Sequence, residues 1–278
     1  MNTLQGMQIE APAKINLSLR VLGKRGDGFH EIETTIAPLT LADGLTFSES
    51  GQGIEFTCND LTVPTGTDNL VVLAAMSFFG AARRDAALRI HLEKRIPHGA
   101  GLGGGSSDAA ATLLALNRGN ALTSDKIYEL GAALGSDVPV FLKNSAAICR
   151  GRGELVEPTN IPRLSLLLLK PEFAIPTPWA YARWANSVEL REFTYQPQTF
   201  LGLTFVNDLE PPVFEKYLFL GQMKMWLLEQ AEVAVALMSG SGSTMFAVLH
   251  DAKNAETLAQ RARAELDPNL WTYPCTTT

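Results

Sequence analysis

Cysteine, histidine and basic residues are scarce in this chain of 278 residues, and their scarcity excludes several classes of site. The three cysteines, Cys58, Cys149 and Cys275, form no C-x-x-C pair, so we expect neither a zinc site nor a disulfide framework, and a reducing compartment is favoured. The four histidines form no H-E-x-x-H pattern. The 23 lysines and arginines are outnumbered by 29 acidic residues, so broad nucleic-acid binding is not expected.

Long apolar runs and targeting signals are also missing. No apolar run approaches the roughly 20 residues that a membrane-spanning helix requires. The N-terminal segment has no basic region followed by an apolar stretch, so no signal peptide is expected. We therefore expect a cytoplasmic protein with no membrane partner.

The composition is that of a globular protein, with 46% hydrophobic and 19% charged residues. At roughly 150 residues per domain, the length favours two domains. The segment EPTNIP at 157–162 interrupts the pattern of strands and helices, so we predict domains at 1–157 and 158–278. Both halves mix strands with helices, which predicts an α+β fold class.

The segment KINLSLRVL at 14–22 alternates like a half-buried strand. Ile15 and Leu17 would point to the core, and Lys14 and Asn16 would share the opposite, polar face. On this evidence alone, Lys14 could be a solvated charge at a sheet edge. A loop rich in glycine and charge follows at 23–30.

Periodicity and capping signals predict the other elements. We expect strands at 32–39, 45–57, 87–94, 146–149, 164–169, 233–237, 245–249 and 271–275. We expect helices at 68–82, 106–117, 124–134, 136–142, 213–230 and 254–266. Thr67 or Asp68 would cap the first helix, and the strand at 164–169 is apolar enough to need cover on both faces. Residues 174–195 show no clear pattern.

A glycine-rich loop lies between the strand at 87–94 and the helix at 106–117. It contains Pro97, His98, Gly99, Ala100, Gly101, Leu102, Gly103, Gly104, Gly105, Ser106 and Ser107. Five glycines leave backbone N–H groups uncovered and allow positive φ, and the following helix offers free N–H groups and a positive dipole end. The loop is therefore predicted to bind a phosphate.

Better-known glycine loops do not fit this segment. A dinucleotide fold needs an acidic residue at the end of a second strand about 20 residues later, where a helix is expected here. A P-loop needs a lysine that the segment lacks, and a protein kinase needs H-R-D and D-F-G motifs that the chain lacks. A flexible turn is a poorer explanation, because the glycines directly precede a strong helix.

Several segments in the same order resemble the galactokinase, homoserine kinase, mevalonate kinase and phosphomevalonate kinase (GHMP) superfamily. They are PAKINLSLRVLGKRGDGFHEIET (12–34), GAGLGGGSSDAA (99–110) and LGSDVPVF (134–141). The resemblance implies two domains, one related to ribosomal protein S5 domain 2 and one ferredoxin-like. It also implies an ATP-dependent kinase acting on a small molecule. Within the superfamily, these three segments are similar to the branch that phosphorylates a cytidine diphosphate-linked sugar alcohol in the non-mevalonate route to isoprenoid precursors.

By this resemblance, Lys14 and Asp137 are the catalytic pair. Asp137 would accept the hydroxyl proton or orient the hydroxyl, and Lys14 would lie near the transferring phosphate. From the residues alone, Asp137 could also be a helix N-cap.

The resemblance also implies which residues bind the two small molecules. His30 would hydrogen-bond the cytosine, and Phe29 would stack on it in place of the commoner tyrosine. Tyr181 would close its other side, or would simply pack within the protein. Asn16 would bond the sugar alcohol. Asn69 would face the adenine of ATP, or would simply belong to a helix cap.

Magnesium is expected on chemical grounds, bridging the β- and γ-phosphates, with Ser107 as its protein ligand. By the resemblance, a second loop at 239–244 would support the site beside the first loop; from the residues alone it could be a loose hairpin. The alternatives are another kinase of the superfamily and a nucleotide-binding regulator without activity. The oligomeric state is left open.

Overall fold

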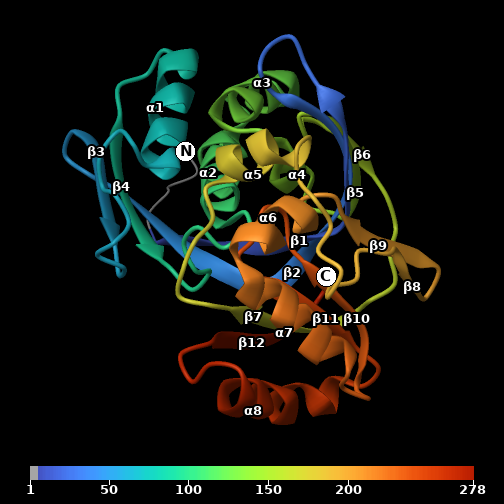
Figure 1. Cartoon of the computed structure of the whole chain (residues 1–278). Helices are drawn as coiled ribbons and strands as arrows, with labels where there is room; N and C mark the ends of the chain where they lie inside the picture. The colour runs from blue at the N-terminus through green and yellow to red at the C-terminus, as the bar shows by residue number, and fades with distance from the viewer. Residues whose placement is uncertain (1–5) are drawn as a thin grey trace.

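The computed structural model describes residues 6–278. Residues 1–5, which belong to the first predicted domain and to the N-terminal segment analysed for a signal peptide, lie outside the described residues. Two β-sheets stack between helices in the middle of the molecule (Figure 1). Among residues 6–278, no helix has the length and apolar character needed to cross a membrane.

Within residues 6–278 the larger sheet has eight strands, in the order β3-β4-β2-β1-β9-β8, with β5 paired to β2 and β6 paired to β5. They are β1 (Met7–Lys24), β2 (His30–Glu49), β3 (Gly53–Cys58), β4 (Ala87–Glu93), β5 (Ala147–Gly151), β6 (Leu155–Pro158), β8 (Gln198–Phe200) and β9 (Leu203–Asn207). The long antiparallel pair β1–β2 forms its centre. One edge of β2 pairs with β5 along 32–36 and with β4 along 44–49.

Four helices cover one face of this sheet (Figure 1). They are α1 (Leu70–Ala82), α2 (Gly104–Leu116), α3 (Ser124–Leu134) and α4 (Val138–Lys143), with a 3-10 turn at Asn117–Gly119. Their apolar side chains, such as Phe78 and Leu113, pack on Phe47 and Ile90 of the sheet. Burial of this face fixes the start of α2 above β1 and β2.

The smaller sheet is antiparallel throughout, in the order β10-β11-β7-β12. Its strands are β7 (Ser165–Lys170), β10 (Val233–Met238), β11 (Met245–Leu249) and β12 (Trp271–Thr276). The helices are α6 (Glu210–Lys216), α7 (Leu218–Leu228) and α8 (Ala255–Glu265), with a 3-10 turn at Ala252–Asn254. Helices between β7 and β10 and between β11 and β12 give the β-α-β-β-α-β order of a ferredoxin-like unit.

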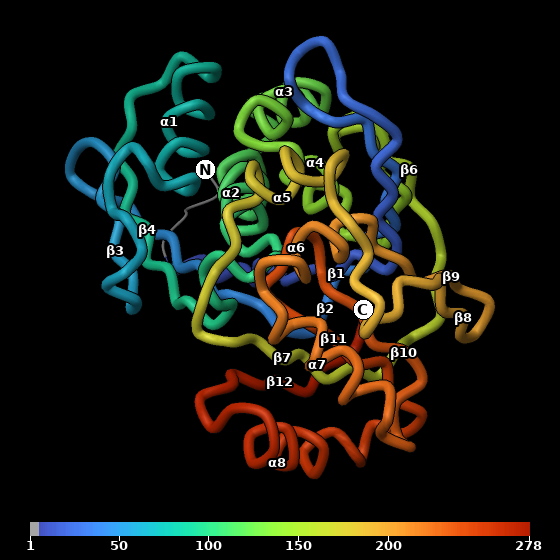
Figure 2. The backbone as a smooth tube through the Cα atoms, in the orientation of Figure 1, coloured from blue at the N-terminus to red at the C-terminus, as the bar shows by residue number. Residues whose placement is uncertain are grey.

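The two sheets pack against each other through β1, β2 and β7. Figure 2 shows the chain of β1 and β2 running between α2 and the smaller sheet. Ile15 and Leu17 meet Leu166 and Leu168 there. Leu167, on the opposite face of β7, packs against residues of α6 and α7, so the prediction that β7 is covered on both faces is confirmed.

The prediction that residues 14–22 form a half-buried strand is wrong for the first residues of that segment. Lys14 and Asn16 do share one face, but each is only 4% exposed. The glycine-rich loop and α2 cover this face, and the backbone N–H of Lys14 donates to Leu102 O at 2.9 Å. Lys14 is therefore a buried lysine and not a solvated edge charge.

Some element boundaries also differ from the prediction. The segment 45–57 is not one strand, because residues 50–52 separate β2 from β3, which begins at Gly53 with φ +74°. The helix expected at 213–230 is broken at Tyr217, whose φ of −112° and ψ of 65° are not helical. The helix after the loop begins at Gly104, two residues before Ser106. Sequence patterns did not indicate β6, β8 or β9, nor α5 (Thr177–Trp184) in the segment without a clear pattern.

Candidate active site

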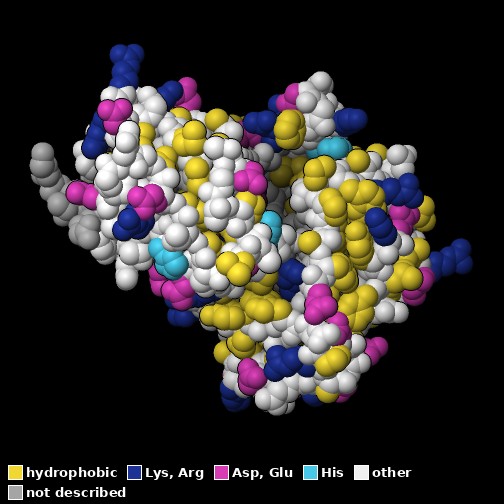
Figure 3. All heavy atoms as spheres, turned by 90° about the vertical axis from the view of Figure 1, so that its left-hand side faces the viewer, with side chains coloured by type: hydrophobic (Ala, Val, Ile, Leu, Met, Phe, Trp, Pro, Cys, Tyr) yellow, Lys and Arg dark blue, Asp and Glu magenta, His cyan; other side chains and the backbone are white. Residues whose placement is uncertain are grey.

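A cavity of about 1020 Å³ opens at the meeting point of the glycine-rich loop, β1, the 24–30 loop, α5 and the 239–244 loop. In Figure 3 the surface is hollowed between two lobes, with hydrophobic and histidine side chains near the hollow. All predicted site residues except Ser107 line this cavity. The structure therefore brings together residues from position 14 to position 181.

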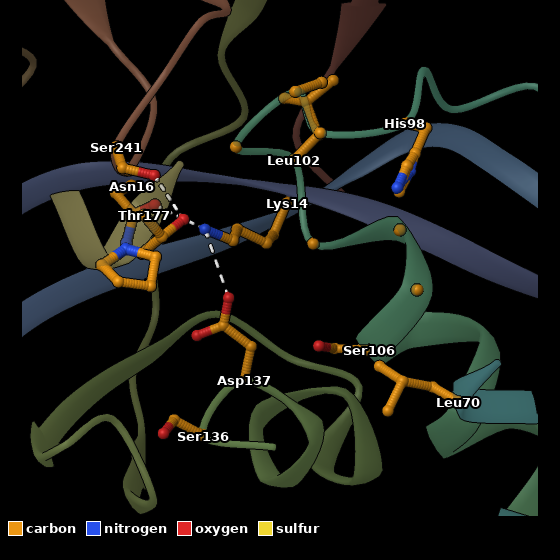
Figure 4. A pocket seen from close by; sticks show the side chains of 18 of the residues that line it. Lys14, Asn16, Leu70, His98, Leu102, Ser106, Ser136, Asp137, Thr177 and Ser241 are labelled. Carbon is orange, nitrogen blue, oxygen red and sulfur yellow. Dashed lines mark hydrogen bonds and ion pairs between the residues drawn. The ribbon is translucent and has the colours of Figure 1, made fainter. Parts of the chain in front are cut away.

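Lys14 lies at the centre of the cavity, and its amine points to both Asn16 and Asp137 (Figure 4). Lys14 Nζ donates to Asn16 Oδ1 at 2.7 Å and lies 3.6 Å from Asp137 Oδ2. Asn16 Nδ2 donates in turn to Thr34 Oγ1 at 2.8 Å, which fixes the Asn16 amide and leaves its oxygen facing Lys14. The Lys14 side chain is 5% exposed and that of Asp137 is 38% exposed. The lysine is therefore enclosed by protein, whereas a small molecule in the cavity can reach the carboxylate.

Asp137 stands at the N-cap position of α4, but its side chain makes no capping hydrogen bond within residues 6–278. Asp137 therefore has the N-cap position that the sequence allowed, but its carboxylate does not cap the helix. Its φ of −86° and ψ of −12° are close to helical, whereas capping side chains usually need an extended backbone. The carboxylate instead faces Lys14 across the cavity.

The glycine-rich loop is anchored by two apolar side chains and opened by its glycines. Ala100 and Leu102 are 3% and 1% exposed and belong to the core between the sheets. Gly101 and Gly103 have φ of +74° and +70°, a region that side chains disfavour. Gly103 directly precedes α2, so the loop exposes backbone at a helix N-terminus, where anions bind favourably.

The 239–244 loop packs directly on the glycine-rich loop. Ser239 Oγ donates to Gly101 O at 3.0 Å, and a Cβ on Gly101 would lie only 2.3 Å from Ser239 O. Asn207 Nδ2 donates to Met238 O and Gly240 O, both at 2.8 Å. Gly101 is therefore required by a close approach between backbones, and the second loop lies beside the first, as the resemblance implied.

Aromatic side chains form the other end of the cavity. The ring centroid of His30 lies 5.3 Å from Tyr181 and 6.0 Å from Trp184, and Phe29 is 50% exposed. Burial, aided by the charge of Lys24, lowers the pKa of His30, so its imidazole is neutral near pH 7. We call this the aromatic end (Phe29, His30 and Tyr181) and the opposite side the glycine-loop end (Pro97–Ser106).

Two residues predicted to contact ATP or its metal ion, Asn69 and Ser107, do not present a free polar side-chain atom to the cavity in the structure. Asn69, and neither Thr67 nor Asp68, caps α1, because its Oδ1 accepts the N–H of Val71 at 2.8 Å. Its Nδ2 donates to Pro64 O at 2.7 Å, so both polar atoms are already used within the protein. Ser107 is 1% exposed, and its Oγ has no hydrogen-bond partner within the described chain. Ser106, one residue earlier, lines the cavity.

Sequence reasoning missed several residues that line the cavity. The guanidinium carbon of Arg152 lies 4.7 Å from the centroid of the Phe29 ring. Thr177 Oγ1 and Ser241 Oγ are 2.7 Å apart and join α5 to the second loop (Figure 4). Lys94 and Asp108 form a buried ion pair beside the glycine-loop end. Of these, only Arg152 carried a local signal, its two flanking glycines.

Comparison with known proteins identifies the family. The model described as "GHMP kinases N terminal domain" matches residues 69–145, and "GHMP kinases C terminal" matches residues 197–267. A 4-diphosphocytidyl-2-C-methyl-D-erythritol kinase from Methylacidiphilum infernorum is 43% identical over 98% of this chain and 96% of its own length. The enzyme of that name from Protochlamydia amoebophila is 38% identical over 89% of this chain and 86% of its own. The chain belongs to the 4-diphosphocytidyl-2-C-methyl-D-erythritol kinase family.

Solved structures agree with this family assignment. A crystal structure of 4-(cytidine 5′-diphospho)-2C-methyl-D-erythritol kinase superposes with a TM-score of 0.80 and 34% identity, covering 98% of this chain and 100% of that one. A homoserine kinase from Cytophaga hutchinsonii superposes with a TM-score of 0.71 at 19% identity, which shows a shared fold alone. The predicted α+β, two-domain GHMP-kinase fold is confirmed, and the chain is a kinase that acts on an alcohol group.

Proposed function

We propose that this kinase transfers the γ-phosphate of ATP to the 2-hydroxyl of 4-diphosphocytidyl-2-C-methyl-D-erythritol. The observation that carries the proposal is the position of the Lys14–Asp137 pair, 3.6 Å apart, in one cavity with the glycine-loop end and the aromatic end. The proposed substrate is the one in the name of relatives that are 43% and 38% identical to this chain.

Phosphoryl transfer requires positioned phosphates, charge neutralisation and an oriented nucleophile, with little covalent work for the protein. Asp137 accepts the hydrogen bond of the substrate hydroxyl, and accepts its proton if the transfer requires it. Lys14 stabilises the negative charge on the transferring phosphate. Asn16 orients the Lys14 amine through the 2.7 Å hydrogen bond, so the amine has a fixed position before either small molecule binds.

The glycine-loop end binds the ATP phosphates in this proposal. Backbone N–H groups of residues 101–106 and the first turn of α2 supply donors and a positive dipole end. The positive φ of Gly101 and Gly103 turns the backbone so that no Cβ blocks it. Asn69 lines the same cavity and shapes the adenine pocket while it caps α1.

The aromatic end binds the cytidine. A neutral His30 can donate from one ring nitrogen and accept at the other, which suits the mixed donor and acceptor edge of cytosine. Phe29 and Tyr181 supply ring faces for stacking. Arg152, beside Phe29, adds positive charge to this part of an otherwise acidic protein.

Magnesium belongs to the proposal as a partner of ATP. Within residues 6–278, no group of three or more His, Cys, Asp or Glu side chains could hold a metal, which fits an ion bound mainly by phosphate oxygens and water. Ser106, which lines the cavity, would hold the ion, and Ser107 beside it, whose buried Oγ has no partner within residues 6–278, would be a second ligand. When bound, the ion supplies neutralisation of the β- and γ-phosphate charge.

A cytoplasmic location, expected from the unpaired cysteines, is also part of the proposal.

The proposal is tested by ADP release with ATP, Mg²⁺ and a panel of alcohols. We expect turnover with the cytidine diphospho-alcohol and at least about a hundredfold lower kcat/KM with homoserine and mevalonate, because neither fills the aromatic end. Equal or better turnover with homoserine or mevalonate would assign the chain to another kinase activity. ATP binding without turnover of any alcohol would indicate a regulator.

A further inference from the structure

Three charged side chains form a buried cluster under the glycine-rich loop. Lys94 Nζ donates to Asp43 and, at 2.9 Å, to Asp108 Oδ2. The exposed fractions of these side chains are 8%, 0% and 2% for Lys94, Asp43 and Asp108. Burial disfavours the lysine charge, but attraction to Asp108 and Asp43 outweighs burial and raises the pKa of Lys94, so the amine stays charged.

The cluster joins both ends of the loop to the centre of the larger sheet. Asp43 belongs to β2, and its Oδ1 accepts the backbone N–H groups of Arg95 at 2.6 Å and Ile96 at 2.8 Å, where the chain enters the loop. Asp108 belongs to α2, where the chain leaves the loop. Lys94 is bonded to both carboxylates, so the entry and the exit are fixed relative to one strand.

The loop also lies directly on the lysine amine. A Cβ built on Gly104, the first residue of α2, would lie 2.9 Å from Lys94 Nζ and 3.1 Å from Ile96 Cγ2. The first turn of α2 therefore has no room to move down toward β2, and Lys94 sets how deep it can lie. Lys94 and the first turn of α2 both line the cavity. The position of the first turn above Lys94 therefore determines where its backbone N–H groups face the cavity.

Stability is a poor explanation for this cluster. Burying one amine and two carboxylates requires their desolvation, and apolar side chains of similar volume often replace such clusters without loss of stability. Hydrogen bonds between charged groups are short and directional. They therefore specify a geometry that apolar packing alone would leave less defined.

We propose that Lys94, held between Asp43 and Asp108, is a positioning residue for the nucleotide loop and sets the place of its phosphate-binding backbone. The inference rests on the proposed ATP site. Lys94 does not act on the cytidine substrate, because the cluster is attached to the glycine-loop end of the cavity. Its loss should affect ATP affinity selectively.

The decisive variant replaces the cluster without leaving an unpaired charge: Asp43→Asn, Lys94→Met and Asp108→Leu together. The change Asp43→Asn retains an acceptor for the N–H groups of Arg95 and Ile96. We expect a Tm within a few degrees of wild type, a roughly tenfold or greater rise in the Kd for ATP by calorimetry, and an unchanged Kd for the cytidine diphospho-alcohol. Wild-type ATP affinity in this variant would show that the cluster has only a structural role.

Three single variants separate positioning from general destabilisation. Lys94→Gln keeps an amide donor, so it should weaken ATP less than Lys94→Met does. Leu88→Ala removes a buried side chain of β4, 0% exposed, and should lower Tm without changing the Kd for ATP. Identical losses in Lys94→Gln and Lys94→Met, or ATP weakening in Leu88→Ala, would contradict the inference. If the triple variant does not fold, these single variants decide the question. Failure of wild type to bind ATP would instead overturn the proposed function.

Discussion

The two ends of the cavity are built in different ways. The glycine-loop end is one continuous segment whose chemistry lies in backbone N–H groups, fixed by glycine φ values and by buried anchors such as Leu102. The aromatic end consists of side chains from separate elements, with His30 and Tyr181 meeting at 5.3 Å. A phosphate can be bound by backbone of almost any sequence that bends correctly, whereas a base requires particular side chains. Lys14 and Asp137 lie where the two ends meet.

The largest effect is expected at this meeting point. Asp137→Asn removes the carboxylate charge but keeps the shape, and should lower kcat roughly a hundredfold to ten-thousandfold. Because neither end of the cavity changes, calorimetric affinities for ATP and for the cytidine substrate should stay near wild type. A kcat close to that of wild type would remove Asp137 from the catalytic pair.

A change at the glycine-loop end should break nucleotide binding. At Gly103, with φ +70°, a Cβ would lie 2.8 Å from Phe141 Cζ and 3.0 Å from Lys14 Cγ. Gly103→Val should therefore displace the loop and abolish detectable ATP binding, partly by disturbing Lys14 itself. Gly80→Val is the matched control, because a Cβ at Gly80 meets no atom of residues 6–278 within 4 Å. Unchanged ATP affinity in Gly103→Val would show that the loop does not hold the phosphates.

A change at the aromatic end should have a smaller effect, confined to the other substrate. His30→Ala leaves polar groups of the cytosine unpaired, at a cost of about 1–3 kcal/mol, or roughly tenfold to a hundredfold in kcat/KM. The KM for ATP should hardly change. Phe29→Tyr, which restores the commoner family residue, should be tolerated. Equal losses for both substrates would indicate that His30 has a structural role, and no loss for either would remove it from the site.

The smallest effect expected is a pH dependence of the aromatic end. The pKa of His30 lies below its ordinary value of 6.5 because of burial and Lys24. The neutral imidazole is therefore present at neutral pH and is lost as the pH falls through that lowered value. The KM for the cytidine substrate should rise severalfold at acid pH, and this rise should disappear in His30→Ala. A KM that rises equally in both proteins would come from another group.

The same contrast between the two ends explains what the sequence could predict. The chemistry of 97–107 is local, so glycine spacing and a following helix indicated a phosphate loop without any relative. The pairing of Lys14 with Asp137 was predicted only by resemblance, because 123 positions separate them and no periodicity connects them. Lys94, Asp43 and Asp108 were missed because the cluster exists only once β2, β4 and α2 are packed together.

The fold shows the same limit. The alternation in β1 indicated a strand correctly, but the burial of Lys14 depends on the loop and helix that cover it. β9 was missed because Leu203–Asn207 is short, and it is stabilised by parallel pairing with Ser18 and Leu19 far away in the chain. Long-range pairing and cover are tertiary effects that a local pattern does not encode.

The most direct test of the proposed reaction is phosphorus NMR of the products formed from ATP, Mg²⁺ and the cytidine diphospho-alcohol. We predict one new phosphomonoester signal whose phosphorus couples to carbon 2 of the alcohol. This signal should grow together with ADP and be nearly absent with Asp137→Asn. ADP formed with inorganic phosphate alone, or a phosphomonoester at another hydroxyl, would contradict the proposed transfer to the 2-hydroxyl.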